Sequence, residues 1–243
     1  MSAVILQTAG GAILFDDDIL GRVSDADFTP VGWPAASPVG GKPGASGRGN
    51  TVFVKSDRGE FVLRHFMRGG LVGRYVSDSY LWLGEKATRA FAEWRLLSRL
   101  VAMDLPVPRP AAARYVRAGL TYRADLLTVR IPDIVPLSER IADAPCGDEF
   151  WQSLGAQVAS FHRAGVCHAD LNAYNVQIDS GDSLWLVDFD RGRLRQPGSW
   201  QQKNLARLNR SLNKIKRLDP GLEFSESDWR RFLDGYFTSA RFR

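Results

Sequence analysis

The chain has 243 residues, of which 44% are hydrophobic and 24% charged, values typical of a globular protein with one large domain or two closely joined lobes. No apolar run approaches the roughly 18 residues that span a bilayer, and the N-terminus lacks the basic stretch of a secretory signal. Two cysteines are too few for a disulfide framework and suit a reducing cytosol.

The net charge of +5 is distributed unevenly along the chain. Residues 191–243 carry a balance of +8, whereas the rest of the chain carries −3. A basic C-terminal segment predicts an anionic partner, such as a phosphorylated lipid, a membrane surface or a nucleic acid. A solvated basic face without a partner is the alternative interpretation.

The first hundred residues favour strands followed by one helix. Residues 1–50 are rich in Gly, Pro and Asp and are predicted to form loop. Strand-like runs at 51–55 and 61–66 are separated by a turn, which predicts a hairpin. Residues 87–100 are predicted to form a helix, because apolar side chains recur there at three-to-four spacing: Ala90, Phe91, Trp94, Leu97 and Leu100.

A second hairpin is expected at 112–116 and 122–131, before a connector marked by Pro132 and Pro136. Helical patterns dominate after this connector, with one more short hairpin among them. The expected elements are a helix with an apolar stripe from Phe150 to Phe161 that runs up to Gly165, strands at 175–178 and 184–187, and helices at about 200–217 and 225–240. The N-terminal half is therefore mostly strand and the C-terminal half mostly helix.

The residues with the clearest chemical meaning lie in segments 168–175 and 186–190, which read HADLNAYN and LVDFD. Phosphoryl transfer needs a positioned hydroxyl, a group that accepts its proton and metal ions that neutralise the phosphates. Asp170 offers a carboxylate that can orient and deprotonate a hydroxyl. Asn175 and Asp188 offer oxygen ligands of the kind that Mg²⁺ prefers. A turn and a short hairpin would bring these three residues into one site.

The order H-x-D-x-x-x-x-N, hydrophobic strand, D-F resembles the catalytic and metal-binding loops of protein-kinase-like folds. The resemblance implies an α+β, two-lobed fold, with a small, mainly-β N-lobe that contains one helix and a larger, mainly-α C-lobe. We expect the N-lobe to span residues 1–132, with 1–45 partly irregular, and the C-lobe to span 133–243. ATP and Mg²⁺ are the implied cofactors, with Asp170 catalytic and with Asn175 and Asp188 as metal ligands.

The same resemblance implies a nucleotide site in the N-lobe. Arg64 occupies the position on the third strand where the fold normally has a lysine, and Glu93 occupies the position of its partner on the following helix. Gly47 and Gly49, before a strand, are candidates for a loop that covers phosphates. Lys55, at the end of the preceding strand, is the alternative phosphate contact. The spacing of Arg64 to Glu93 favours Arg64.

Further segments narrow the resemblance to the 3-deoxy-D-manno-octulosonic acid (Kdo) kinases of Gram-negative bacteria. That family belongs with the lipopolysaccharide core heptose kinases, and the resemblance covers roughly residues 45–240. It implies ATP-dependent phosphorylation of the 4-hydroxyl of Kdo on a lipid A precursor, at the cytoplasmic face of the inner membrane, in lipopolysaccharide core assembly. The segments that carry it are 64–70, 78–80, 88–93, 105–108, 122–128 and 168–170.

Residues 201–217 form a basic segment without an acid, in which four apolar residues repeat at helical spacing. We interpret the apolar stripe as core and the basic face as a surface for an anionic membrane or for the phosphates of lipid A. On this hypothesis, exchange of Arg207, Arg210 and Lys214 for Glu should weaken binding to anionic vesicles. The basic residues are Lys203, Arg207, Arg210, Lys214, Lys216 and Arg217.

Three other functions are compatible with parts of the sequence. One is a heptose kinase or another kinase-like phosphotransferase that acts on an antibiotic, a small metabolite or a protein. The Arg-Gly-Gly segment at 68–70 and the replacement of the usual lysine by Arg64 argue against this other phosphotransferase. A second is a non-catalytic kinase-fold scaffold, against which the joint presence of Asp170, Asn175 and Asp188 argues. The third is a basic nucleic-acid binder. Because no recognised nucleic-acid-binding module is present, we expect no nucleic-acid partner.

Overall fold

The computed structural model describes residues 2–39, 51–67, 78–219 and 221–241. The chain divides into two compact units. The first unit comprises residues 1–99 and 108–130, and the second comprises 100–107 and 131–243. The predicted loop glycines Gly47 and Gly49 lie outside the described residues.

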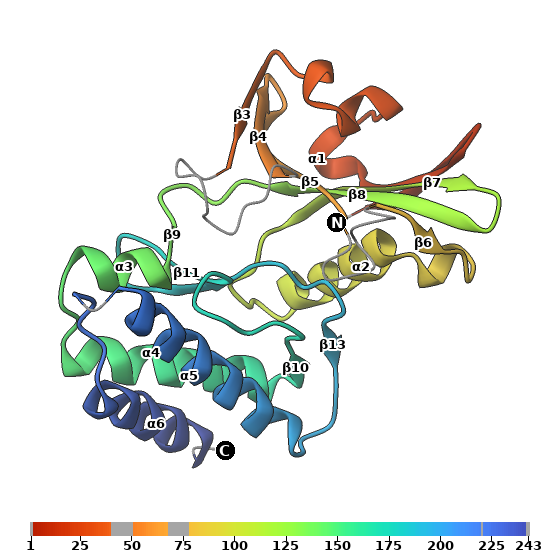
Figure 1. Ribbon diagram of the computed structural model, residues 1–243. Coiled ribbons are helices and arrows are strands. Elements are labelled where there is room, and N and C mark those ends of the chain that lie inside the picture. The colour runs from red at the N-terminus through yellow and green to blue at the C-terminus, as the bar shows by residue number, and fades with distance from the viewer. Residues whose placement is uncertain (1, 40–50, 68–77, 220, 242–243) are drawn as a thin grey trace. The chain divides into compact units, whose positions relative to one another are not determined.

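The first unit is built on an antiparallel sheet in which β1 and β3 are the edge strands (Figure 1). The strand order is β1-β2-β7-β8-β5-β4-β3, and β6 pairs with β8. Both predicted hairpins are confirmed, as the pairs β4–β5 and β7–β8. The strands are β1 (Ala3–Thr8), β2 (Gly11–Asp16), β3 (Ala35–Pro38), β4 (Thr51–Ser56), β5 (Gly59–His65), β6 (Tyr80–Leu81), β7 (Pro110–Ala118) and β8 (Thr121–Val129).

The prediction that residues 1–50 form loop was wrong. β1 and β2 pair as a tight hairpin, and β2 also pairs with β7 inside the sheet. A short helix α1 (Asp17–Leu20), two 3₁₀ turns (Asp25–Phe28 and Pro30–Gly32) and strand β3 follow. The missed signal is a pair of apolar runs on either side of a two-residue turn that contains Gly10, which favours a hairpin. The side chains of β2 are buried, and burial of its apolar residues in the core stabilises the strand.

The core of the first unit gathers apolar side chains from the N-terminal segment and from the sheet. Trp33 packs against Phe61 with ring centroids 5.4 Å apart, and its indole Nε1 donates to the backbone oxygen of Asp27 at 2.9 Å. The N-terminal segment is therefore part of the folded unit. The cluster comprises Ile13, Phe15, Leu20, Phe28, Trp33, Val54, Phe61, Leu63, Ala111, Ala112 and Leu127.

Helix α2 (Arg89–Ala102) confirms the predicted helix, and all five residues of its apolar stripe are buried. Its N-terminal part lies in the first unit, where the ring of Phe91 meets that of Tyr115 edge-to-face at 5.2 Å. Glu93 is a buried carboxylate on this helix. A buried charge needs a partner of opposite charge or several hydrogen bonds.

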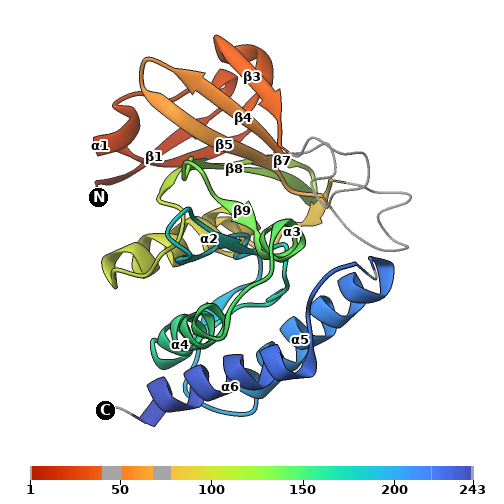
Figure 2. The same ribbon diagram turned by 90° about the vertical axis from the view of Figure 1, so that its left-hand side faces the viewer.

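The second unit is mainly helical, with two small sheets. Helices α4 and α6 run side by side (Figures 1 and 2). The three-stranded sheet has the order β12-β11-β9, and β10 pairs with β13. The elements are β9 (Val135–Pro136), α3 (Leu137–Asp143), α4 (Asp148–Arg163), β10 (Val166–Cys167), β11 (Val176–Ile178), β12 (Leu184–Leu186), β13 (Arg193–Leu194), α5 (Trp200–Leu218) and α6 (Glu226–Arg241).

The mixed composition of strands and helices confirms the predicted combination of α and β structure. Strands make up most of the first unit and helices most of the second. Within the described part of the chain, none of the helices has the length and apolar character needed to cross a membrane. The division into two kinase-like lobes stays a prediction.

Candidate active site

A tight turn places Asp170 and Asn175 together between β10 and β11. The side-chain oxygen of Asn172 accepts hydrogen bonds from the backbone N–H groups of Tyr174 at 2.8 Å and Asn175 at 3.0 Å. Asn residues favour turns because their side chains can bond to nearby backbone in this way. Asn175 in turn donates from Nδ2 to the backbone oxygen of Asp170 at 2.9 Å. The chain therefore folds back on itself within six residues, from 170 to 175.

His168 joins this turn to the segment that carries Asp188. Its Nδ1 accepts the backbone N–H of Asp170 at 3.1 Å, so its Nε2 carries the proton and donates to the backbone oxygen of Val187 at 3.0 Å. The ring is buried, and burial lowers the pKa of His168. The imidazole is therefore neutral and holds two backbone segments together.

Asp188 lies just after β12, in the left-handed backbone region with φ 62°. Asp tolerates this region better than most residues do. The preceding residue, Val187, donates its backbone N–H to the carbonyl of Asn175 at 3.1 Å. The structure thus brings the segments of Asp170, Asn175 and Asp188 together in the second unit.

Helix α5 contacts this turn at three positions that sequence reasoning did not assign to the site. Asn204 donates from Nδ2 to the backbone oxygen of His168 at 2.8 Å. Arg207 donates from Nε to Oδ1 of Asp170 at 2.7 Å. The hydroxyl of Ser211 accepts the backbone N–H of Ala173 at 3.2 Å. Residues 204, 207 and 211 share one face of a helix, because i, i+3 and i+7 lie in line.

The sequence held little signal for these α5 contacts. The three residues lie more than 30 positions after the turn that they contact. Arg207 was counted among the basic residues of a membrane-facing stripe, but its guanidinium is bound to Asp170. Their i, i+3, i+7 spacing places them on one face of α5, but the helix has other polar residues, such as Asn209 and Asn213, so the spacing alone does not distinguish them.

In the first unit, Arg64 on β5 and Glu93 on α2 form an ion pair of 2.5 Å. The Glu93 side chain is only 2% exposed, so Arg64 supplies the partner that a buried carboxylate requires. Lys55, the alternative phosphate contact, instead pairs with Glu60 across the β4–β5 hairpin at 2.6 Å and is largely exposed. The predicted partners Arg64 and Glu93 therefore do meet.

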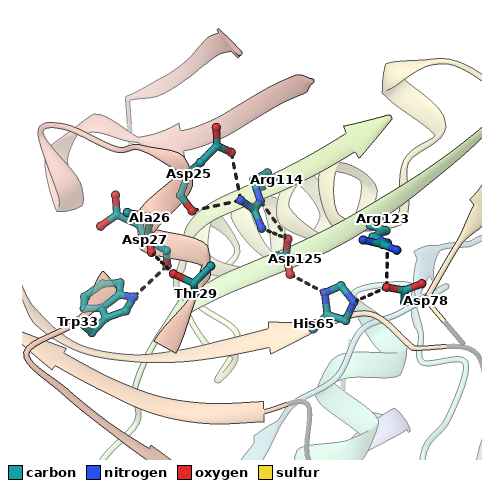
Figure 3. A network of polar contacts seen from close by, with 10 residues as sticks. All are labelled: Asp25, Ala26, Asp27, Thr29, Trp33, His65, Asp78, Arg114, Arg123 and Asp125. Carbon is teal, nitrogen blue, oxygen red and sulfur yellow. Dashed lines mark hydrogen bonds and ion pairs between the residues drawn. The ribbon is translucent and has the colours of Figure 1, made fainter. Parts of the chain in front are cut away.

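A second polar network includes His65 on β5 (Figure 3). His65 contacts Asp125 through Nδ1 at 2.6 Å and Asp78 through Nε2 at 3.4 Å. Arg114 connects Asp125 to Asp25, with distances of 2.8 Å and 3.1 Å. The hydrogen bond with Asp125 raises the pKa of His65, an effect that burial partly opposes. This network joins β5, β7, β8 and the first 3₁₀ turn.

The residues predicted to bind a metal ion, Asn175 and Asp188, both carry oxygen atoms as ligands. Among the described residues, no group of three or more His, Cys, Asp and Glu side chains could hold a metal ion. Asn175 commits Nδ2 to Asp170, and its Oδ1 accepts no hydrogen bond from the described residues. Mg²⁺ uses one or two protein ligands together with water and phosphate oxygens. An amide oxygen of Asn175 and the carboxylate of Asp188 fit that requirement.

Comparison with known proteins identifies the class to which this chain belongs. The model of the lipopolysaccharide kinase (Kdo/WaaP) family matches residues 42–236. The chain therefore belongs to this family, and the predicted kinase class is confirmed. Use of ATP follows from the family.

Individual relatives carry a more specific name. A protein of Xanthomonas axonopodis pv. citri is 47% identical over 208 residues, which cover 85% of this chain and 82% of the relative. One of Stenotrophomonas maltophilia K279a is 44% identical over 228 residues, covering 93% and 89%. Both are called 3-deoxy-D-manno-octulosonic acid kinase. A remote likeness is to the solved structure of the Cydia pomonella granulovirus kinase PK-1, at 11% identity and a TM-score of 0.39, covering 59% of this chain and 47% of that chain.

Proposed function

We propose that this protein is a Kdo kinase that transfers the γ-phosphoryl group of ATP to the 4-hydroxyl of Kdo on a lipid A precursor, in lipopolysaccharide core biosynthesis. The family and the name shared by relatives at 44–47% identity support the substrate class. The observation that carries the chemistry is the loop in which Asp170, Asn175 and the segment of Asp188 are bonded together in the second unit. A kinase-like, two-lobed fold is part of this proposal.

Asp170 is the residue that we assign to the acceptor hydroxyl. Its carboxylate accepts the hydroxyl proton while the acceptor oxygen forms its bond to the γ-phosphorus. The bond between that phosphorus and the bridging oxygen breaks, and its electron pair leaves with ADP. Such reactions depend mainly on positioning and on electrostatic stabilisation. The hydrogen-bonded turn that contains Asp170 supports this role, because it fixes the backbone from which the carboxylate projects.

We assign Arg64 to the phosphates of ATP, with Glu93 holding its side chain. A guanidinium can bond to phosphate oxygens with two parallel N–H groups, and it keeps its charge at every pH of interest. The ion pair with buried Glu93 supports the assignment, because it fixes the position of the guanidinium on β5. Gly47 and Gly49 are proposed to cover the phosphates.

Asn175 and Asp188 are the residues that would hold Mg²⁺. The hydrogen bond from Nδ2 of Asn175 to the carbonyl of Asp170 orients the amide so that its oxygen remains available. The ion would neutralise charge on the phosphates when bound. His168, which is neutral and buried, holds the backbone of both segments and does not exchange its proton with the substrate.

We further propose that the protein works at the cytoplasmic side of the inner membrane as a peripheral protein. Lys203, Arg210 and Lys214 are exposed on α5 and lie on one stripe of that helix with Arg207. A basic helical surface attracts anionic lipid headgroups. The stripe contains the arginine that binds Asp170, which supports an anionic acceptor approaching along α5.

The proposal is tested by transfer of ³²P from [γ-³²P]ATP with Mg²⁺ to three acceptors: a lipid A precursor that bears Kdo, the same lipid without Kdo, and a heptose-bearing core. We expect label only on the acceptor whose terminal sugar is Kdo, and none with the Asp170→Ala variant. Label on the heptose acceptor alone would reassign the substrate within the family. NMR of the labelled product then shows whether the phosphate is on C4 of Kdo. Its loss on phosphatase treatment shows that it is a monoester.

A further inference from the structure

The half-exposed carboxylate of Asp170 is held from one side by a single cation. Arg207 donates to Oδ1 from Nε at 2.7 Å and also from Nη2, so both donors converge on the same oxygen. The other oxygen, Oδ2, has no partner among the described residues. The two oxygens of the carboxylate are therefore chemically distinct, and one is available to a substrate.

The position of Arg207 is itself fixed by its neighbours on α5. One turn before it, Asn204 is buried and bonds to the carbonyl of His168 at 2.8 Å. One turn after it, Ser211 bonds to the backbone N–H of Ala173 at 3.2 Å. The helix is thus fastened to the turn on both sides of Arg207. A planar guanidinium on such a base can hold a carboxylate in one orientation, which a flexible ammonium does less well.

Resting on the proposed function, we propose that Arg207 is a positioning residue for phosphoryl transfer: it fixes Asp170 through Oδ1 and so presents Oδ2 to the acceptor hydroxyl. Both side chains are 47% exposed, and exposed ion pairs contribute little to folding stability. The pair therefore adds little to the stability of the unit, and its main effect is on the orientation of Asp170. A contact that merely blocked Asp170 would have the opposite kinetic effect.

The test compares Arg207→Met and Arg207→Lys with the wild-type chain. Loss of a positioning contact of this kind costs on the order of 10²-fold in rate. We expect Arg207→Met to lower kcat by roughly that factor, with the KM for ATP changed less than about twofold, and Arg207→Lys to recover part of the loss. Arg230→Met is the matched control, because Arg230 pairs with Glu226 on the exposed face of α6. It should leave kcat unchanged.

A double-mutant cycle shows whether Arg207 acts through Asp170. In the Asp170→Ala background, Arg207→Met should have little further effect on kcat, because the carboxylate that it orients is gone. An equal loss in both backgrounds would mean that Arg207 acts elsewhere and would overturn the proposal. An unchanged kcat of Arg207→Met would also overturn the proposal. An increased kcat would overturn it too, and would show that Arg207 blocks Asp170 in the wild-type chain.

The same cycle is measured on the slow hydrolysis of ATP without acceptor, where water takes the place of the hydroxyl. Failure of the wild-type chain to phosphorylate the Kdo acceptor would contradict the proposed substrate only. The dependence of hydrolysis on Arg207 and Asp170 would still support or overturn the positioning role. Thermal unfolding of each variant verifies that the full chain is folded.

Discussion

Among single residues, substitution of Asp170 most clearly distinguishes an effect on catalysis from an effect on folding stability. We expect Asp170→Ala to lower kcat by about 10²–10⁴-fold, the usual contribution of general-base catalysis, with little change in Tm. Its ion pair is half exposed and adds little stability. Initial rates of ADP formation and thermal unfolding measure the two effects. Asp148→Ala is the control, because Asp148 has a comparable surface pair with Arg231 at 2.8 Å. Near-normal turnover of Asp170→Ala would remove Asp170 from the mechanism.

The residues of the candidate site differ in how far the sequence predicts them. Asp170, Asn175 and Asp188 could be predicted because their spacing within one turn and one hairpin is local, and local spacing is visible in a sequence. The pairing of Arg64 with Glu93 depended on a family resemblance. Arg207 could not be predicted as a partner of Asp170, because that contact depends on how α5 packs against the turn.

The basic stripe of α5 can now be tested without disturbing Asp170. Exchange of Lys203, Arg210 and Lys214 for Glu leaves Arg207 intact and removes three cations from the exposed face. Each basic residue near an anionic membrane contributes about 1 kcal/mol, so affinity for phosphatidylglycerol vesicles should fall by roughly 10²-fold or more. Vesicle co-sedimentation at fixed ionic strength measures this affinity.

A charge-matched control separates the stripe from net charge. Three exposed basic residues elsewhere receive the same exchange, which alters the net charge equally, and binding should then fall much less. Equal losses for the two triple variants would show that α5 has no particular role at the membrane. The control residues are Lys86, Arg99 and Arg230.

Helices α4 and α6 approach so closely that each contributes a glycine to the contact. A Cβ atom at Gly155 would lie 1.9 Å from the carbonyl oxygen of Phe232, and one at Gly235 would lie 1.9 Å from that of Gln152. Glycine in a helix normally costs about 1 kcal/mol relative to alanine, so the close approach must offset that cost.

We therefore expect Gly155→Ala to destabilise the protein although alanine favours helix. The clash is with backbone, which cannot rotate away, and overpacking of this kind costs about 1–3 kcal/mol or more. Urea denaturation followed by circular dichroism measures the free energy of unfolding. At Gly198 a Cβ atom would meet its nearest neighbour, Trp200, at an ordinary 3.7 Å, so Gly198→Ala is the control. Equal stability of Gly155→Ala and wild type would mean that the helices separate easily.

At the scale of elements, strands and helices could be predicted where one periodicity dominated. Helix α2 and hairpin β7–β8 have such patterns and agree with the prediction within two or three residues. The N-terminal hairpin was missed because Gly, Pro and Asp elsewhere in residues 1–50 outweighed two short apolar runs. Its stability comes from pairing with β7, about 100 residues later, which no local pattern reports.

Across the whole molecule, the pKa values of the three histidines are shifted in opposite directions in the two units. His65, in the first unit, has a raised pKa because of its hydrogen bond with Asp125. His162 and His168, in the second unit, are buried, and burial lowers the pKa of His162 to about 4 and that of His168 in the same direction. The stabilising effect of His65 is therefore present below pH about 6.5 and is lost as pH rises through its folded pKa.

The two buried histidines, His162 and His168, change the stability with pH in the opposite direction to His65. Their folded pKa values lie below the unfolded value, so the unfolded chain binds more protons, and stability is lost as pH falls below about 6.5. For His162 the loss continues down to its folded pKa of about 4. For His162 alone, the loss at pH 5 is about 2 kcal/mol. Most carboxylates remain ionised above pH 5, which makes pH 5 to 7.5 the useful range.

We expect hydrogen exchange, corrected for intrinsic rates, to show that acidification from pH 7.5 to 5 weakens protection in α4 and α6 but not in β5 and β8. His162 bonds through Nδ1 to the hydroxyl of Tyr236 at 2.8 Å, and this contact joins α4 to α6. His162→Gln should reduce the pH response of the second unit only, with His168 accounting for the remainder, and His65→Gln should alter that of the first unit only. Loss of protection in both units with the same pH dependence, unaltered by either substitution, would show that carboxylates rather than histidines control stability in this range.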